Sequence, residues 1–392
     1  MTPGRVFVLA LVVAAAIVVA TGILPAPSSL ALVERVGPVL GFVVAITIVT
    51  ELASEAGLFA VLSDRLAGWG RRRVWMLWLF VLALATLSTI FLSLDTTAVL
   101  VTPVVVLLAL HAGIPPVPFA LATVWLANTA SLLLPVSNLT NLLAASALRF
   151  GGPFDYVALV WAPALVGVLV PIVILTGVFW RRLGGVRGRY EVPERASIAD
   201  RRLLVVSAVV VAVLLPLLVS GLPVWIPATA GAVVLVVAFG VRRRSSLSVR
   251  LVPWSAVGIA AGLFVLVEAA QVHGLSGAVA AVAGSGTSLP ALLQLTGVGA
   301  VAANGINNLP AYLVIEPAAA GDPLRLAALL IGVNLGPLVT PWASLATLLW
   351  HQRVTSLGVS ISWPRFVVFG LAAVLVTLPL AVLALWLSAG AP

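Results

Sequence analysis

The length of the apolar runs constrains this chain more than any other feature. Uncharged segments long enough to cross a membrane recur along the sequence, as between Tyr156 and Trp180. About 20 apolar residues in a helix span the hydrocarbon core of a bilayer. Because lipid cannot pair with backbone N–H and C=O groups, a chain without barrel strands crosses it only as helices. The sequence therefore predicts an all-α polytopic membrane protein.

Composition excludes several classes of function. Hydrophobic residues make up 62% of the chain and charged residues 8%, against roughly 45–50% and 25% in soluble domains. The net charge of +9 does not indicate a nucleic-acid partner, because the arginines gather in short loops as the positive-inside rule predicts. The absence of cysteine excludes disulfides and thiolate metal sites. No metal triad, nucleophile–base pair or cofactor motif is present, so we predict no enzyme, metal or cofactor.

Two polar breaks interrupt the apolar sequence in the same way. The first runs from Ala127 through Asn141, and the second from Asn334 through Thr347. They superpose without a gap, with these positions aligned: Asn128 on Asn334, Pro135 on Pro341, Asn138 on Ser344 and Asn141 on Thr347. Matched breaks in two halves of a membrane protein are typical of secondary transporters built from two repeats.

A second polar cluster precedes each break, at Ser93–Thr97 and at Asn304–Pro310. The apolar arms around Ser93–Thr97 fit either two full spans or a re-entrant hairpin whose tip reaches the middle of the membrane. We favour the hairpin, because Asp95 would otherwise face the interface although it lies beside Thr96 and Thr97 in an apolar setting. The same argument gives a second hairpin in the C-terminal half.

These features predict the domain organisation. The expected units are an N-terminal repeat 1–180 with hairpin 74–112 and broken helix 118–150, a cytoplasmic linker 181–202, and a C-terminal half 203–392 with hairpin 290–316 and broken helix 324–352. A second helix is expected to begin near Gly37. The excess of arginine on one side makes the hairpins enter from opposite faces, so the repeats are inverted.

The breaks predict one shared binding site. A broken membrane helix frees backbone groups, which persist where they line a cavity or bind a ligand. Half-helix N-termini favour electron-rich groups, and amide and hydroxyl oxygens suit Na⁺ or a proton carrier. The expected lining is Asp95, Thr96, Thr97, Asn128, Ser137, Asn138, Asn141, Asn307, Asn308, Asn334, Thr340, Ser344 and Thr347.

Two acidic residues are candidates for proton coupling. An ionisable group at bilayer depth is costly and therefore indicates function, which makes Asp95 the first candidate. The alternative is that Asp95 only caps the helix that follows it. Glu268 is the second candidate, because it lies deep in an apolar segment.

Several motifs resemble those of the arsenite/antimonite efflux permeases. The matching residues are Gly336 through Trp350, Asn307-Asn308-Leu309-Pro310, Asp95 with Thr102-Pro103, and Asn128 with Asn138 and Asn141. These permeases belong to the ion transporter superfamily, together with divalent-anion/sodium symporters. The resemblance implies an elevator-type fold of inverted repeats and proton-driven extrusion of arsenite, sometimes aided by a soluble ATPase subunit.

The chain departs from that family at three places. It has Leu94 where the family usually has Asn, Asn334 where the family has Asp, and no Lys near Leu338. The predicted site is therefore less charged than the resemblance implies.

We thus expect proton-coupled efflux of arsenite or antimonite across the cytoplasmic (inner) membrane. The alternatives are a sodium- or proton-coupled carrier of carboxylates or inorganic anions, and a sodium/proton antiporter. A membrane anchor for a soluble ATPase would leave the matched breaks unexplained. The expected partners are a small oxyanion or metalloid, protons or Na⁺, and lipid, with an ATPase subunit and a homodimer as further candidates.

Overall fold

The chain is helical throughout the part that the structure describes. The computed structural model describes residues 3–148, 153–192, 198–319 and 321–390. The helices of the first half are α1 (Pro3–Ala20), α2 (Ala26–Glu55), α3 (Leu58–Trp69), α4 (Val74–Phe91), α5 (Leu94–Thr96), α6 (Thr102–His111), α7 (Pro116–Thr129), α8 (Leu139–Ala147) and α9 (Pro153–Phe179). Those of the second half are α10 (Arg201–Leu218), α11 (Trp225–Arg242), α12 (Trp254–Val272), α13 (Leu275–Ala283), α14 (Leu289–Ile306), α15 (Asn308–Ala319), α16 (Pro323–Leu335), α17 (Leu345–Ser356) and α18 (Trp363–Ser388).

Length and composition confirm the prediction of a multi-pass protein. Among the described residues, 9 helices are long and apolar enough to cross a membrane, from Ala26–Glu55 to Trp363–Ser388. The helices α7 and α16, which carry the breaks, are shorter and are buried along almost their whole length. Their burial places the breaks inside the protein rather than against lipid.

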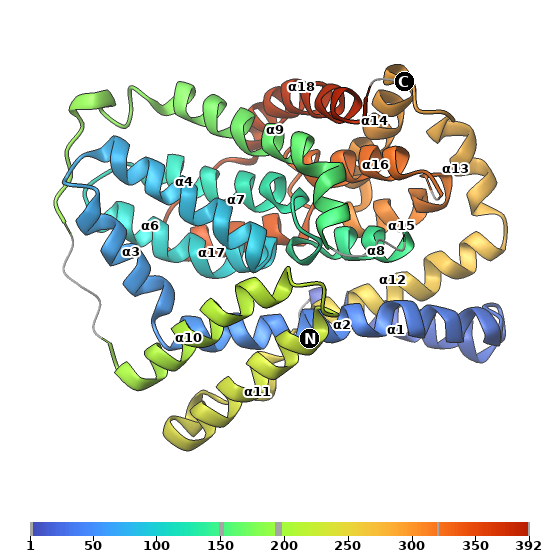
Figure 1. Ribbon diagram of the computed structural model, residues 1–392, viewed down its shortest axis with the longest axis horizontal. Coiled ribbons are helices and arrows are strands. Elements are labelled where there is room, and N and C mark those ends of the chain that lie inside the picture. The colour runs from blue at the N-terminus through green and yellow to red at the C-terminus, as the bar shows by residue number, and fades with distance from the viewer. Residues whose placement is uncertain (1–2, 149–152, 193–197, 320, 391–392) are drawn as a thin grey trace.

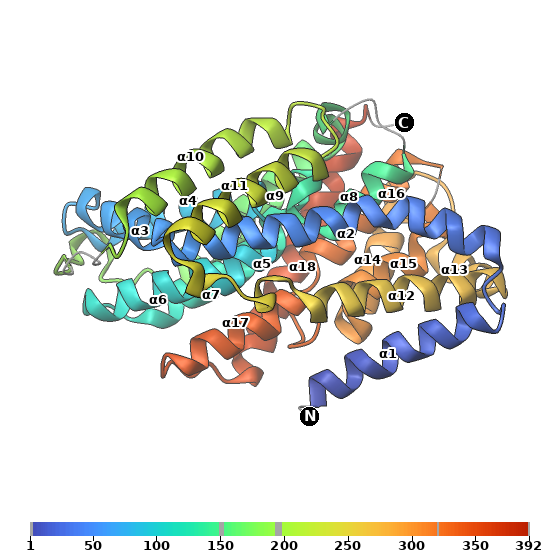
Figure 2. The same ribbon diagram turned by 90° about the horizontal axis from the view of Figure 1, so that it is seen from below.

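The helices form two groups, which lie side by side. One outer layer consists of α1, α2, α10, α11 and α12, which Figure 2 shows in front of the remaining helices. The other group, here called the core, contains α4–α9 and α14–α18 (Figure 1). The two halves of the chain contribute to both groups, as expected for a fold with internal repeats.

The repeats are arranged in opposite directions. The short helices α3 and α13 lie at opposite ends of the molecule in both views (Figures 1 and 2). The hairpin α4–α6 extends inward from the end of α3, and the hairpin α14–α15 from the end of α13. The tip helix α5 lies in the middle of the molecule (Figure 2). Both arms of this hairpin, Val74–Phe91 and Leu94–His111, are among the helices long and apolar enough to cross a membrane, so the re-entrant hairpin stays a prediction.

Two helix boundaries differ from the sequence prediction, and a proline lies inside the helix near each of them. Helix α2 begins at Ala26 and not near Gly37, and it continues through Pro38. Helix α15 continues through Pro317 to Ala319. Membrane helices tolerate proline where neighbouring groups satisfy the freed carbonyl. The predicted end of the first broken helix at 149–150 lies outside the described residues.

Small residues let the second broken helix pack closely on its hairpin. At Gly332 of α16, an added methyl group would collide with the carbonyl oxygen of Thr296 on α14. At Gly336 the same addition would collide with the side chain of Ala300. Close approach through small residues is typical of membrane helix interfaces. It fixes the neighbouring Asn334 relative to the second hairpin.

Candidate substrate site

The first break is held together by asparagine side chains of its own repeat. Helix α7 ends at Thr129, and short 3₁₀ turns lead to α8. Asn138 caps α8, since its Oδ1 accepts from the Thr140 N–H at 3.3 Å. The Asn141 Nδ2 donates to the carbonyls of Ser131 (2.6 Å) and Leu134 (3.0 Å). The freed carbonyls of the break therefore have partners without lipid or water.

The backbone of the second break is hydrogen-bonded by a side chain of the neighbouring hairpin. Ser344 caps α17, since its Oγ accepts from the Thr347 N–H at 3.2 Å. The Asn304 Nδ2, at the end of α14, donates to the Gly336 carbonyl at 2.8 Å, and the Asn304 Oδ1 accepts from the Thr340 N–H at 3.0 Å. Asn304 was not among the predicted site residues, although it belongs to the polar cluster Asn304–Pro310 that the sequence identifies.

The two breaks are joined through Asn334. Its Oδ1 accepts from the Asn138 Nδ2 at 3.0 Å and from the Thr140 Oγ1 at 2.8 Å. Its Nδ2 donates to the Asn141 Oδ1 at 2.6 Å. These contacts bridge 193–196 positions in the sequence. They confirm that the aligned breaks meet, and they leave Asn334 fully engaged with protein groups.

Asn128, which aligns with Asn334, forms hydrogen bonds only through its Nδ2 within the described chain. Its Nδ2 donates to the Val124 carbonyl at 2.9 Å and more weakly to the Thr347 Oγ1 at 3.4 Å. Its Oδ1 is buried and accepts no hydrogen bond within the described part of the chain. A buried acceptor without a partner costs roughly 1–3 kcal/mol. A ligand that donates a hydrogen bond would recover this free energy.

The first hairpin tip presents a carboxylate. Asp95 lies in α5, whose backbone is fixed by the Ser93 side chain accepting from the Thr96 N–H at 3.1 Å. No ion pair or hydrogen bond joins the Asp95 carboxylate to another described residue. Helix α5 packs against both α7 and α17. Asp95 is thus placed beside the two breaks with its charge unpaired.

Three other predicted residues hold the first tip in place. The hydroxyl groups of Thr97 and Thr89 lie 2.8 Å apart, which ties the two arms of the hairpin. The Ser137 Oγ donates to the Ile90 carbonyl at 2.6 Å, which ties the arm to the first break. The Thr96 hydroxyl lies 3.0 Å from the Ser93 Oγ. These side chains position the tip.

The second hairpin tip is joined to its own break. The Asn307 Nδ2 donates to the Trp342 carbonyl at 3.0 Å, and the Asn308 N–H donates to the Ala343 carbonyl at 2.9 Å. The Thr340 Oγ1 donates to the Asn304 carbonyl at 2.7 Å. Asn307 has φ +86°, a left-handed conformation that asparagine tolerates better than most residues. This tip has no carboxylate at the place of Asp95, so the repeats differ chemically.

The structure thus gathers the predicted residues from both hairpins and both breaks, but not Glu268. Glu268 lies on α12 in the outer layer, where its charge acts on Glu316 of α15. Glu316, the last residue of the predicted hairpin 290–316, was not among the predicted site residues. An acidic residue directly after an apolar run was the signal that could have identified it.

The electrostatics of the site combine acceptor side chains with the N-termini of helices. Helices α8, α15 and α17 all begin at the breaks or tips, so their N–H groups contribute positive partial charge. The only charged member of the predicted set is Asp95, and no ion pair among the described residues supplies a cation to it. No group of His, Cys, Asp or Glu that could hold a metal ion occurs in the described residues.

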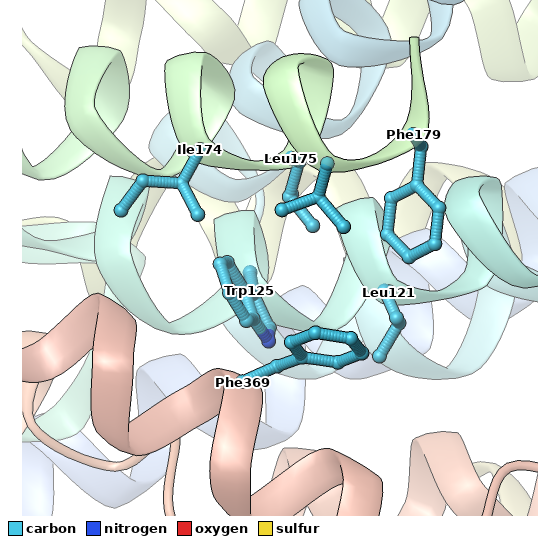
Figure 3. Close-up of a pocket in the computed structure, with 7 residues that line it drawn as sticks. Leu121, Trp125, Ile174, Leu175, Phe179 and Phe369 are labelled. Carbon is cyan, nitrogen blue, oxygen red and sulfur yellow. The ribbon is translucent and has the colours of Figure 1, made fainter. Parts of the chain in front are cut away.

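An apolar pocket elsewhere in the core is not a second site. Figure 3 shows it between α7, α9 and α18, with Leu121, Trp125, Leu175 and Phe369 among its lining residues. Of the side chains that line this pocket, Trp125 carries a polar atom, its indole nitrogen, and the others are hydrocarbon. A polar substrate would lose hydration in this pocket without compensation.

Comparison with known proteins identifies the family. A family model described as "Citrate transporter" matches residues 1–323. The chain belongs to this citrate transporter family. Its relatives include the "Arsenical pump membrane protein" of Escherichia coli, 30% identical over 381 residues, which cover 88% of this chain and 85% of the relative. The protein of the same name from Yersinia enterocolitica is 29% identical over 373 residues, with the same coverage.

These relatives confirm the resemblance to the arsenite/antimonite permeases and the assignment as a multi-pass protein of the cytoplasmic membrane. A solved structure agrees with the fold. The YdaH transporter of Alcanivorax borkumensis, described as having an unusual topology, aligns with a TM-score of 0.54 over 92% of this chain and 88% of that chain. At 16% identity this likeness shows the fold alone. The protein is a secondary transporter of the family.

Proposed function

We propose that this transporter exports arsenite or antimonite in exchange for protons. The observation that carries the proposal is the buried Asn128 Oδ1, which accepts no hydrogen bond within the described chain, together with the Asp95 carboxylate at the first hairpin tip. Such a site favours a ligand that donates hydrogen bonds and carries no negative charge. The names of the relatives that are 29–30% identical to the chain support the same substrate class.

Arsenite fits these acceptors. It is mostly a neutral hydroxide at pH 7, so its OH groups can donate to Asp95 and Asn128 without requiring a cation in the site. Soft thiolate ligands, which commonly bind As(III), are absent because the chain has no cysteine. The transported species would therefore be held by hydrogen bonds to oxygen, each worth roughly 0.5–1.5 kcal/mol. Weak binding of this kind permits release on the far side.

The proposed cycle uses Asp95 as the proton carrier. The carboxylate binds a proton from outside, releases it toward the cytoplasm and then accepts the hydroxyl groups of the substrate. The core would carry the site across the membrane relative to the outer layer.

We also retain a soluble ATPase subunit and a homodimer as proposals. Energy from ATP would make efflux independent of the proton gradient, so the transport assay distinguishes the two sources.

The second candidate is a sodium- or proton-coupled carboxylate carrier. The description of the matched family model favours it. A di- or tricarboxylate, however, would bring negative charge next to Asp95, and none of the predicted site residues is cationic. Helix N-termini offset only part of such repulsion, roughly 0.3–1 kcal/mol each. We therefore prefer the neutral substrate.

Everted membrane vesicles test the proposal directly. Vesicles that contain the protein should accumulate arsenite when an inside-acid pH gradient is imposed, and should stop when a protonophore collapses it. Vesicles without the protein are the control, and citrate is tested in parallel. Accumulation of citrate but not of arsenite would replace the proposal with the second candidate, and arsenite uptake that requires ATP would overturn the proton coupling.

A further inference from the structure

A second buried carboxylate lies on the second hairpin, and its cation comes from the outer layer. Glu316 is on α15 of the core and forms an ion pair with Arg35 of α2. The Tyr312 hydroxyl, one turn earlier on α15, donates to the same Glu316 oxygen at 3.1 Å. Neither Arg35 nor Glu316 was identified from the sequence as functional. The pair joins residues 281 positions apart.

The neighbouring elements provide few other charges. Helix α15 packs against α8, α12, α13, α14 and α16. Of these, α8, α13 and α14 contain no ionisable side chain, and α12 contributes Glu268, which is also acidic. Arg325 of α16 donates to backbone carbonyls, including those of Gly284 and Gly286. Within the described chain, Arg35 is therefore the cation that faces Glu316.

The pair crosses the boundary between two parts of the molecule. Helix α2 belongs to the outer layer and α15 to the core. One more polar contact crosses this boundary nearby, from the Gln271 Nε2 on α12 to the Leu313 carbonyl at 2.6 Å. Opposite charges also face each other across the boundary farther along α2, where Glu51 interacts with Arg353 of α17. An apolar cavity of about 230 Å³ lies beside Val219 and Leu134. Movement of the core along α2 would break the pair of Arg35 with Glu316.

Arg35 and Glu316 are buried to different degrees, so breaking their ion pair affects their charges differently. The Arg35 side chain is 35% exposed and the Glu316 side chain only 7%. Arg35 keeps its charge on separation because a guanidinium group does not deprotonate in proteins, whereas a lone Glu316 anion at this depth would be strongly disfavoured. A carboxylate in that position becomes neutral by binding a proton. The Tyr312 hydroxyl can hydrogen-bond to either form of the carboxyl group.

From this geometry we infer that Glu316 is a second coupling carboxylate, neutralised by Arg35 in the present position of the core and by a proton after the core leaves α2. The inference rests on the proposed exchange of substrate for protons. One O–H bond forms on Glu316 when the ion pair opens, with a proton from water. The same bond breaks when Arg35 returns, and the proton goes back to water.

The test measures opening of this boundary without any substrate. Val39 lies one helical turn after Arg35 on α2 and is buried, whereas Val33 is 65% exposed. In this cysteine-free chain, Val39→Cys reports exposure of the boundary, and Val33→Cys corrects for the pH dependence of the thiol itself. The ratio of their N-ethylmaleimide labelling rates, in purified protein in liposomes, is measured from pH 5 to pH 8.

We expect the ratio to rise several-fold as pH falls, because protonation of Glu316 releases Arg35. Glu316→Gln and Arg35→Gln should each give a high ratio that no longer depends on pH. Glu316→Asp should restore the pH dependence, which a merely structural role of the side chain would not do. The matched control is Glu34→Gln, which neutralises the exposed neighbour of Arg35 and should behave like the parent chain.

An identical pH profile in Glu316→Gln and in the parent chain would overturn the inference. So would a flat profile in the parent chain or in Glu316→Asp. A transport assay separates this result from the proposed function. If arsenite is not carried at all, the proposed function fails, and the labelling ratio still decides the role of Glu316.

Discussion

The two broken helices have aligned sequences but different hydrogen bonding. Asn334 in the second repeat uses its carbonyl and its amide group on Asn138, Thr140 and Asn141 of the first. Asn128 uses only its amide group and leaves its Oδ1 buried without a described partner. Asn334 joins the repeats by three hydrogen bonds, and we propose that its counterpart Asn128 binds a ligand.

We propose that this difference lets two aligned repeats form one site instead of two. The hairpin tips also differ, because the first tip carries the Asp95 carboxylate and the second tip, Asn304–Pro310, carries none. The unpaired acceptors therefore come from the first repeat. The second repeat supplies packing, through Asn304 and Asn334, that holds the break in a fixed shape.

The largest effect is expected from Asn334→Ala. The substitution removes the partner of the Thr140 hydroxyl and of the Asn141 Oδ1, and leaves the Asn138 Nδ2 only its longer bond to the Ser131 Oγ at 3.3 Å. Each unsatisfied buried group costs roughly 1–3 kcal/mol, so the total loss of stability should reach about 3 kcal/mol or more. Thermal unfolding in detergent measures it. Stability equal to the parent chain would contradict the structural role of Asn334.

Asn128→Ala should weaken substrate binding more than it lowers the stability of the protein. Stability should change little, because the side chain makes a bond to a helical carbonyl and a long contact to Thr347. Substrate affinity should fall by up to about tenfold, the equivalent of one neutral hydrogen bond of about 1.4 kcal/mol. Binding measured by calorimetry on the same preparations supplies the comparison. If Asn128→Ala unfolds as readily as Asn334→Ala, the proposed difference between the repeats is wrong.

The smallest effects are expected at the aligned caps. Ser344→Ala removes a helix cap worth roughly 1 kcal/mol and should weaken transport a few-fold. Asn138→Ala removes a cap and also the bond to Asn334, so it should destabilise the protein more than Ser344→Ala does. Unfolding curves of both variants, recorded side by side, give the order. The reverse order would show that Asn334 does not depend on Asn138.

Much of this arrangement could be predicted from local sequence. Polar residues inside apolar runs located the breaks and the hairpin tips, since lipid tolerates such residues only where protein surrounds them. The alignment of Asn128 with Asn334 predicted that the breaks would meet. The start of α2 at Ala26 and the end of α15 at Ala319 were missed, because membrane helices can continue through proline, as these do at Pro38 and Pro317.

The partners of individual side chains could not be predicted. Alignment gives Asn128 and Asn334 the same place, but their bonds depend on whether residues 141 and 347 are Asn or Thr and on how the repeats pack. The ion pair of Arg35 with Glu316 joins helices from different groups. Such contacts depend on tertiary packing, which periodicity and composition do not encode.

Substitution of Asp95 tests the central claim, that the first repeat holds a ligand site in which the Asp95 carboxylate takes up substrate and proton in turn. Asp95→Asn keeps the size and hydrogen bonding of the side chain but fixes it in the neutral form. In liposomes, this variant should exchange arsenite between compartments of equal pH and fail to accumulate it when a pH gradient is imposed. Accumulation against the substrate gradient equal to that of the parent chain would contradict the account.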